Sequence, residues 1–309
     1  MPMDSSPESP PASPAAEPSD FRRLREVGER AGLSRVIGAG FCRARNAVAR
    51  GLLALGVVPN MITVAGCLVT IAAGYCLAHG AGDQVPYFYD GHGPRSWWPV
   101  WAAAFMILSG ACDMLDGAVA RIGNLYSRFG GILDSVLDRV SDMALFIGCG
   151  LCFVQRGNLT LLVLALVALC DATLISYIKA RAENTIANCT VGYWMRGERV
   201  AAILIGCLSG HVVAVIWQLA ILSACTAWVR LDYARRAAAA LDAGREPPST
   251  DPPSGWRAWL LPWRHPRGSV AYDIVTGTNI AFIIFGPRLW DVFAAHGEWA
   301  DPLARWFGN

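Results

Sequence analysis

Long stretches of almost uninterrupted apolar residues restrict this chain to folds that cross a membrane. A hydrocarbon core about 30 Å thick needs roughly 20 helical residues to span it, and only helices or closed barrels satisfy the backbone there. The chain of 309 residues is 54% hydrophobic and only 16% charged, with a mean hydropathy of +0.37. This balance is too apolar for a soluble globule of that size. We therefore expect an all-α integral membrane protein.

Six stretches reach or approach the length of a membrane-spanning helix. They are residues 61–79, 97 to about 121, 130–154, 159–179, 200–210 and 211–229. The fifth is short, so we expect it to join the sixth through a tight turn at Ser209, Gly210 and His211. A further apolar patch at 274–285 is broken by Gly277, Asn279 and Pro287. Because it is too short to span, we predict an interfacial or re-entrant segment and no seventh crossing.

The segments outside the six predicted helices differ in composition. Residues 1–20 are almost entirely Pro, Ser, Ala and acids, which predicts a disordered tail. Residues 21–58 mix Arg and Ala with apolar residues, which favours an amphipathic juxtamembrane helix. Residues 59–230 form the predicted six-helix domain, and 231–309 form a C-terminal extension with a Pro-rich linker and interfacial segments.

The positions of the basic residues predict the orientation in the membrane. Short loops rich in Lys and Arg remain in the cytoplasm, and the predicted outer loops carry only Arg95 and Arg156. Both termini are therefore expected to be cytoplasmic. The net charge of +2 excludes a strongly basic nucleic-acid binder. The ten cysteines lie mostly in apolar stretches and are predicted to be small buried hydrophobes, not a disulfide framework.

A cluster of acids within the second and third predicted spans carries the chemistry. Ionisable residues at membrane depth are costly and are therefore candidates for function. Asp113 and Asp116 precede a short turn near Leu125, and Asp134 and Asp138 follow it at matching distances. In an antiparallel hairpin the two pairs would meet, and their repulsion would require a cation among them. An all-oxygen ligand set indicates Mg²⁺, Mn²⁺ or Ca²⁺.

The alternative is that these acids pair with arginines and face the cytosol. Arg121, Arg128 and Arg139 are close enough in sequence for that role. Small residues beside the acids favour the metal site, because a bulky anion and its metals can then approach the backbone. These small residues are Gly117, Ala120 and Gly130.

The pattern Asp113-x2-Asp116-Gly117-x2-Ala120-Arg121-x8-Gly130-x3-Asp134-x3-Asp138 resembles, without a mismatch, the signature of the CDP-alcohol phosphotransferases. The resemblance covers about 59–229 and includes an entry to the first span, Pro59-Asn60-x-Ile62-Thr63, that is similar to the family's. It implies a phospholipid biosynthesis enzyme. Such an enzyme transfers the phosphatidyl-type group of a CDP-lipid, CDP-diacylglycerol or similar, to the hydroxyl of a polar alcohol and releases CMP.

The resemblance also implies roles for individual residues. Asp113, Asp116, Asp134 and Asp138 would hold two divalent ions, Mg²⁺ or Mn²⁺, and Asp138 would be the general base. Residues around this cluster would bind the CDP-lipid; they are Asn60, Thr63, Gly117, Ala120, Arg121, Ser127 and Gly130. Two acids outside the signature, Asp142 and Asp171, are predicted to be structural hydrogen-bonding partners.

The acceptor site is inferred from two further segments. Residues 176–183 (SYIKARAE) and 196–199 (RGER) are most similar to the family branch whose acceptor is inositol phosphate. The residues implied are Ser176, Lys179, Arg181, Arg196 and Arg199. Lys179 is the only lysine in the chain, and Arg196 with Arg199 could fork a phosphate. One departure is Met195, where an acid is expected. The alternative is that these charges only anchor the inner face.

Other functions stay open at this point. The same chemistry could use glycerol phosphate or another alcohol as acceptor. A Mg²⁺-dependent membrane prenyltransferase or an ion transporter could also use buried acids. The expected location is the cell (inner) membrane, with membrane lipids around the helices and the active site facing the cytoplasm. The resemblance also implies a homodimer as one option.

Overall fold

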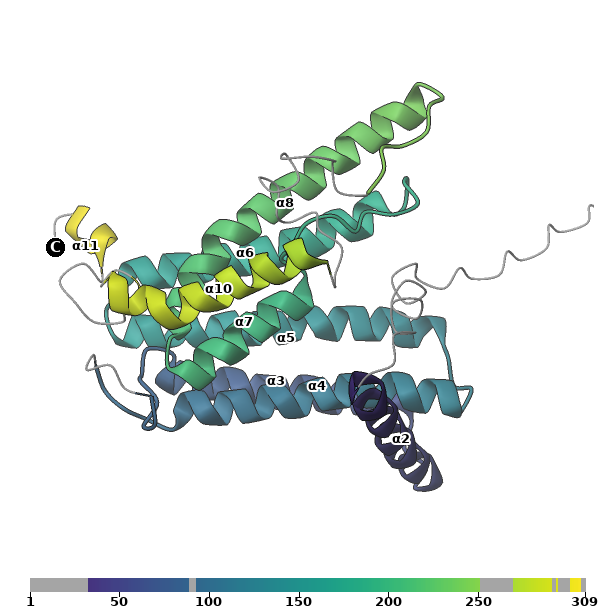
Figure 1. Ribbon diagram of the computed structural model, residues 1–309, viewed down its shortest axis with the longest axis horizontal. Coiled ribbons are helices and arrows are strands. Elements are labelled where there is room, and N and C mark those ends of the chain that lie inside the picture. The colour runs from purple at the N-terminus through teal and green to yellow at the C-terminus, as the bar shows by residue number, and fades with distance from the viewer. Residues whose placement is uncertain (1–32, 89–92, 251–268, 291–292, 294–300, 307–309) are drawn as a thin grey trace, which may run out of the picture.

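The computed structural model describes residues 33–88, 93–250, 269–290, 293 and 301–306 (Figure 1). Every regular element in these ranges is a helix, apart from two isolated β-bridges in the 84–95 region. The prediction of an all-α protein is confirmed. The tail predicted at residues 1–20 lies outside the described ranges.

Six helices form the bundle that carries the acid cluster. They are α3 (Pro59–Gly80), α4 (Trp98–Ile122), α5 (Arg128–Gln155), α6 (Leu159–Ala182), α7 (Arg196–Ser209) and α8 (Val212–Asp242). Each matches one of the six predicted apolar stretches. The last helix continues past residue 230, so the predicted start of the C-terminal extension falls inside α8.

Local sequence signals set the helix boundaries. Ser127 precedes α5 and accepts a hydrogen bond from the Gly130 amide at 2.9 Å, and Asn158 caps α6 in the same way. Such caps satisfy amides that the first turn leaves unpaired. Gly210 ends α7 in the left-handed conformation, with φ of 74°, which glycine adopts without steric cost. The predicted tight turn between the fifth and sixth stretches is confirmed.

Glycines allow α3 and α5 to touch along their backbones. A Cβ atom added to Gly148 would lie 2.1 Å from the Gly74 carbonyl oxygen, and one added to Gly74 would lie 2.4 Å from that of Ala144. Small residues permit such close approach in membrane bundles. The contact holds the second half of α3 against the second half of α5. The cysteines of the described residues are free and most of them are buried, as predicted.

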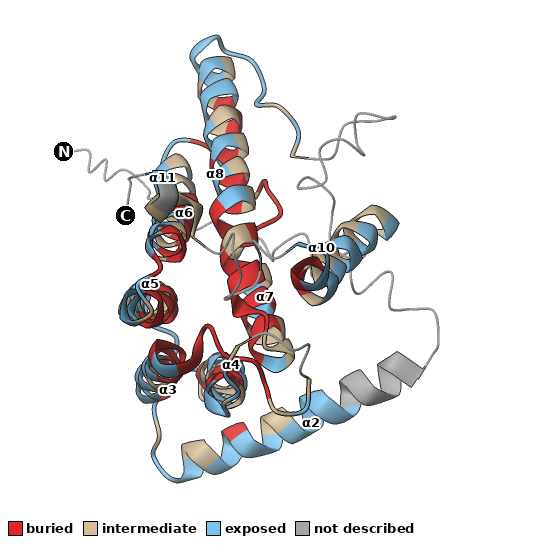
Figure 2. Cartoon of the chain, turned by 90° about the vertical axis from the view of Figure 1, so that its left-hand side faces the viewer, coloured by how far each residue is buried: buried red, intermediate tan, exposed pale blue. Residues whose placement is uncertain are grey.

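Helix α2 (Leu33–Ala54) lies across the bundle. Figure 2 looks along α3 to α6 and shows α2 running crosswise beside α4. Ala49 is buried against Ile62, Ala118 and Val119. Most of the other described side chains of α2 are exposed. This arrangement agrees with the predicted juxtamembrane helix, whose residues 21–32 lie outside the described part.

Five described helices are long and apolar enough to cross a membrane, namely α3, α4, α6, α8 and α10. Helix α5 is not among them because Asp134, Asp138 and Asp142 interrupt its apolar sequence. Helix α7 is too short, with 14 residues or about 21 Å of helix. Helix α7 nevertheless runs through the bundle. Arg196 at its start contacts Asp138 of α5, and Leu208 near its end accepts a hydrogen bond from Tyr87 in the α3–α4 loop.

The last apolar patch forms a longer helix than the sequence predicted, whereas its interfacial or re-entrant location stays a prediction. Residues Val270–Leu289 form one continuous helix, α10, of 20 residues. Ser269 caps its start by accepting from the Tyr272 amide. Asn279 does not break the helix, because its side-chain amide donates to the Val275 carbonyl. Gly277 is accommodated in the helix interior, and Pro287 stands inside the last turn, where it removes one backbone hydrogen bond just before the helix ends.

Helix α10 carries the chain from one end of the bundle to the other. Near its start, Tyr272 donates to Glu198 in the first turn of α7 at 2.9 Å. Near its end, the Arg288 guanidinium lies 4.8 Å from the centre of the Phe88 ring in the α3–α4 loop. The short helix α11 (Pro302–Trp306) then packs against α6, where Asp301 accepts from the Leu159 amide.

The described C-terminal helix therefore lies at the end of the bundle opposite α2 and the α4–α5 turn (Figure 1). Helix α10 is thus one further apolar helix beside the six of the bundle, long enough by its length and composition to cross a membrane. The count of six crossings and the cytoplasmic location of both termini stay predictions.

This arrangement predicts that Trp306 and Ala239 face opposite sides of the membrane. Both residues are exposed, the second near the end of α8. In intact cells a membrane-impermeant maleimide should label only one of the two variants Trp306→Cys and Ala239→Cys, and permeabilised cells should show both. The parent chain, with exposed Cys42 and Cys170, provides the background. Labelling of both variants in intact cells would contradict a crossing by α10.

Candidate active site

Three carboxylates converge where α4 and α5 meet. Asp113, Asp116 and Asp134 each offer an oxygen within 4.8 Å of the others. The short connection between the helices makes this possible, and Asn124 within it adopts a positive φ of 49°, which asparagine tolerates better than most residues. The predicted hairpin therefore brings both helices' acids to one depth.

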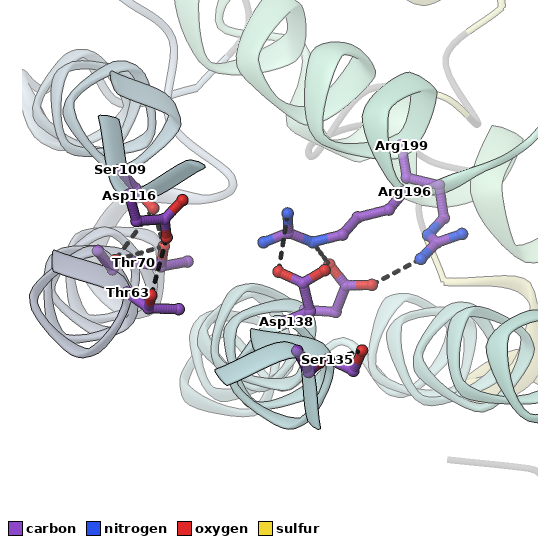
Figure 3. A network of polar contacts seen from close by, with 11 residues as sticks. Thr63, Thr70, Ser109, Asp116, Ser135, Asp138, Arg196 and Arg199 are labelled. Atoms are coloured by element: carbon purple, nitrogen blue, oxygen red, sulfur yellow. Dashed lines mark hydrogen bonds and ion pairs between the residues drawn. The ribbon is translucent and has the colours of Figure 1, made fainter. Parts of the chain in front are cut away.

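The fourth acid of the signature has a different partner. Asp138 forms an ion pair with Arg196 of α7 at 3.0 Å (Figure 3). Within the described residues, none of the four acids forms an ion pair with Arg121, Arg128 or Arg139. The alternative that these arginines neutralise the acids is not supported.

The acids line a cleft with a polar and an apolar part. The polar part is lined by all four acids, Thr63 and Arg196. A second cavity shares Asp113 and Arg196 with it and adds Met106, Leu145 and Val200. The cleft therefore offers polar walls beside apolar ones, which suits a ligand with a charged headgroup and a hydrocarbon chain.

Helix α3 contributes polar side chains to this cleft. Thr63 donates to the Asp116 carboxylate at 2.8 Å and so positions one of its oxygens. Two turns further along α3, Thr70 and Ser109 share a hydrogen bond of 2.7 Å between α3 and α4. The prediction that Thr63 lies at the site agrees with this geometry.

Among the residues predicted to bind the CDP-lipid, the two glycines and their neighbours differ from Ala120 and Arg121. A Cβ added to Gly117 would meet no atom within 4 Å, whereas one added to Gly130 would lie 3.1 Å from Asn60 Oδ1 and 2.9 Å from Ser127 Oγ. These positions leave the backbone open or hold polar atoms close to it. Ala120 is buried in helix packing and Arg121 is exposed, so neither lines the described cavities.

The chemistry of the acid set fits a divalent cation. Three carboxylates so close together repel one another in a low-dielectric environment unless a cation lies among them. All the candidate ligand atoms are carboxylate oxygens, which Mg²⁺ and Mn²⁺ prefer. Asp138 adds a fourth carboxylate to the same cavity.

The two arginines of the predicted acceptor site have different environments. Arg196 lines the cleft. Arg199 is only 1% exposed and donates to Asp142 at 2.6 Å and to the Trp194 carbonyl at 3.0 Å. Asp142 lies between them, since its other oxygen is 3.6 Å from Arg196. The prediction that Asp142 is a structural partner is confirmed, and Arg199 does not line the cleft.

The other predicted acceptor residues lie at the end of α6. Lys179 forms an ion pair with Glu183 at 3.9 Å, Ser176 donates to a carbonyl of its own helix, and Arg181 is exposed. None of the three lines the two cavities of the cleft. Asp171 is buried, and its Oδ2 has no hydrogen-bond partner among the described residues, so a structural role through hydrogen bonding is not seen.

Arg230 is a buried residue that the sequence analysis missed. It is 2% exposed and donates to the Ile175 carbonyl at 2.7 Å and to the Val191 carbonyl at 3.0 Å. It thereby joins α8, α6 and the segment before α7. Sequence gave no signal for this role, because its partners are backbone carbonyls that any residue could supply.

The chain belongs to the CDP-alcohol phosphatidyltransferase family, whose model matches residues 56–231. It is thus a CDP-alcohol phosphotransferase, a class of transferase of phospholipid biosynthesis. An archaetidylinositol phosphate synthase from Methanothermobacter thermautotrophicus is 37% identical over 154 residues, covering 50% of this chain and 68% of that protein. A phosphatidylinositol phosphate synthase from Mycobacteroides abscessus is 31% identical over 227 residues, covering 69% and 96%.

Solved structures show the same relationship. The chain resembles a crystal structure of Mycobacterium tuberculosis phosphatidylinositol phosphate synthase in complex with manganese and citrate. The TM-score is 0.52 and the identity 28%, over 69% of this chain and 97% of that one. A second structure of that enzyme, with CDP-DAG bound, has a TM-score of 0.50 and 28% identity, over 62% and 92%.

Arg199→Ala is predicted to destabilise the protein. It removes the partner of a buried carboxylate, a change that typically costs about 3–5 kcal/mol. The midpoint of thermal unfolding in detergent should fall well below that of the parent, whereas Arg181→Ala, an exposed control on α6, should leave it unchanged. An Arg199→Ala protein of parental stability with a raised acceptor KM would instead make Arg199 a substrate-binding residue.

Proposed function

We propose that this protein transfers the phosphatidyl-type group of a CDP-lipid, CDP-diacylglycerol or similar, to a hydroxyl of inositol phosphate and releases CMP. The observation that carries the proposal is the cleft itself. Three converging carboxylates at one side and an Asp138–Arg196 pair at the other line the same cavity. The two relatives are named as synthases of inositol phosphate lipids, which supports inositol phosphate as the acceptor.

Asp113, Asp116, Asp134 and Asp138 would hold two divalent cations, Mg²⁺ or Mn²⁺. The manganese complex of the mycobacterial enzyme supports this choice of metal. When bound, such cations neutralise the charge that develops on a diphosphate during transfer.

Asp138 is the proposed general base. Its carboxylate takes the proton of the acceptor hydroxyl, whose oxygen bonds to the lipid-side phosphorus. The bond from that phosphorus to the CMP oxygen breaks, and CMP leaves with the electron pair. A base must lie within hydrogen-bond reach of the proton that it removes, and a carboxylate facing the cleft satisfies this requirement.

Arg196 is the proposed acceptor-binding residue. Its planar guanidinium can bind a phosphate through two parallel hydrogen bonds, and it already contacts Asp138. An acceptor phosphate on Arg196 would therefore bring the sugar hydroxyls next to the base. Lys179, Arg181 and Ser176 stay proposals as outer contacts of the acceptor.

The nucleotide is proposed to lie against the α4–α5 turn. Asn60, Ser127 and the backbone at Gly117 and Gly130 face this region, and Arg121 is exposed one turn from Gly117, where it can reach a diphosphate. The arginines near this end favour a cytoplasmic active site in the cell membrane. Assembly as a homodimer is a prediction of the family resemblance.

The test is release of CMP from CDP-diacylglycerol by the purified protein. Inositol phosphate, glycerol phosphate and serine are offered in turn, with Mg²⁺ or Mn²⁺ and with chelator. We expect CMP with inositol phosphate only, and none with chelator. Release of CMP with glycerol phosphate alone would make glycerol phosphate the acceptor. No release with any alcohol would overturn the proposal in favour of a prenyltransferase or a transporter.

Asp134→Ala is predicted to give folded, inactive protein. Removing one carboxylate relieves repulsion in the cluster and also removes a proposed metal ligand. CMP release should fall at least about 100-fold, while the thermal unfolding midpoint stays equal to or above that of the parent. Asp242→Ala, at the exposed end of α8, is the control and should keep full activity. Full activity in Asp134→Ala would end the metal-site proposal.

Arg196→Lys is predicted to weaken acceptor binding. A lysine keeps the charge but cannot form the fork, so the acceptor KM should rise about tenfold to a hundredfold, equivalent to roughly 1.5–3 kcal/mol. The KM for the CDP-lipid should barely change. Arg235→Lys on the exposed side of α8 is the control. An equal rise in both KM values would remove Arg196 from the acceptor site.

A further inference from the structure

A second groove lies on the other side of α7. It runs between α7 and α10. Ala201 and Ile205 line it from α7, and Ile280 and Ile283 line it from α10. Its walls are therefore mostly hydrocarbon along the length of both helices.

This groove meets the catalytic cleft at Gly197. Gly197 lines the groove and also the cavity that contains Asp113, Asp142 and Arg196. The two neighbours Val200 and Ala201 lie on different sides of α7, the first on the cleft and the second on the groove. Helix α7 thus separates the two apolar cavities, and Gly197 in its first turn is a residue that both of them share.

Hydrogen bonds between helices hold the outer wall of the groove in place. Tyr272 donates to Glu198 at 2.9 Å, and the Tyr193 hydroxyl donates to that of Thr276 at 2.9 Å. Deeper along α10, the Gln218 side chain of α8 donates to the Asn279 side-chain oxygen at 2.5 Å. Hydrogen bonds of this kind fix helix positions in a membrane.

Helix α10 lies outside the residues 56–231 that match the family. Figure 2 shows it beside α7, on the side away from α5. The groove is therefore a feature of this chain that is added to the shared domain.

We propose that the groove binds one hydrocarbon chain of the CDP-lipid donor, an inference that rests on the proposed function. With the diphosphate at the acid cluster, one chain passes Gly197 and lies between α7 and α10. The other chain stays on the α4 side of α7, against Met106 and Val200. Because lipid tails are as apolar as these walls, the groove contributes selectivity for chain length and shape more than affinity.

The first experiment fills the groove. Ala201→Phe places a ring in it from α7, and Ile280→Trp does so from α10. With either variant, the KM for a donor with long acyl chains should rise about tenfold, while the KM for a dioctanoyl donor and for the acceptor stay unchanged. The control is Ala104→Phe. Ala104 is exposed, and helical geometry places it on the face of α4 opposite Met106 and Gly110.

The second experiment needs no turnover. A CDP-diacylglycerol that carries a diazirine in one chain should crosslink to α7 and α10, and Ala201→Phe should reduce this labelling. Phosphatidylglycerol with the same chain should label α10 much less. Equal labelling by both lipids would show a general lipid site and overturn the proposal. An unchanged preference for donor chain length in Ala201→Phe and Ile280→Trp, with CMP still released, would also overturn it. Absence of CMP release together with α10 labelling by the donor would overturn the proposed function but support the groove.

Discussion

Repulsion among carboxylates at membrane depth is the constraint on which this structure depends. Five aspartates of α4 and α5 lie along one cleft, and two of them, Asp138 and Asp142, are balanced by Arg196 and Arg199. The other three form no ion pair within the described part of the chain. Asp113 is exposed and the other two are partly buried, but three carboxylates this close still repel one another, so the arrangement is suited to a cation among them.

Helix α7 connects this charge balance to the rest of the molecule. Arg199 holds Asp142 in the interior, Asp142 faces Arg196, and Arg196 reaches Asp138 in the cleft. On its other side, the same first turn contacts α10 through Glu198. A shift of α10 would therefore move the turn that carries Arg196, the proposed acceptor-binding residue, which links a helix outside the family domain to the cleft.

Much of the site could be predicted because its information is local. The spacing around the α4–α5 turn specifies a hairpin, and periodicity then places the acids together. Partners distant in sequence gave no such signal: Arg199 and Asp142 are 57 residues apart, so Arg199 was grouped with substrate-binding residues. Helix α10 was missed since Asn279 and Gly277 were weighed as breakers, whereas hydrogen bonds to Val275 and from Gln218 satisfy the Asn279 side chain.

The short length of α7 explains where the reaction takes place. Its 14 residues span about 21 Å, whereas α5 has 28 residues and extends further toward the α4–α5 turn. Helix α7 begins beside Asp138, and Asp134 lies one turn further along α5 toward the α4–α5 turn. The three converging carboxylates therefore lie just beyond the start of α7, and Arg196 in its first turn lines the cleft. A water-soluble acceptor can thus reach a membrane-bound donor without leaving the bundle open along its full length.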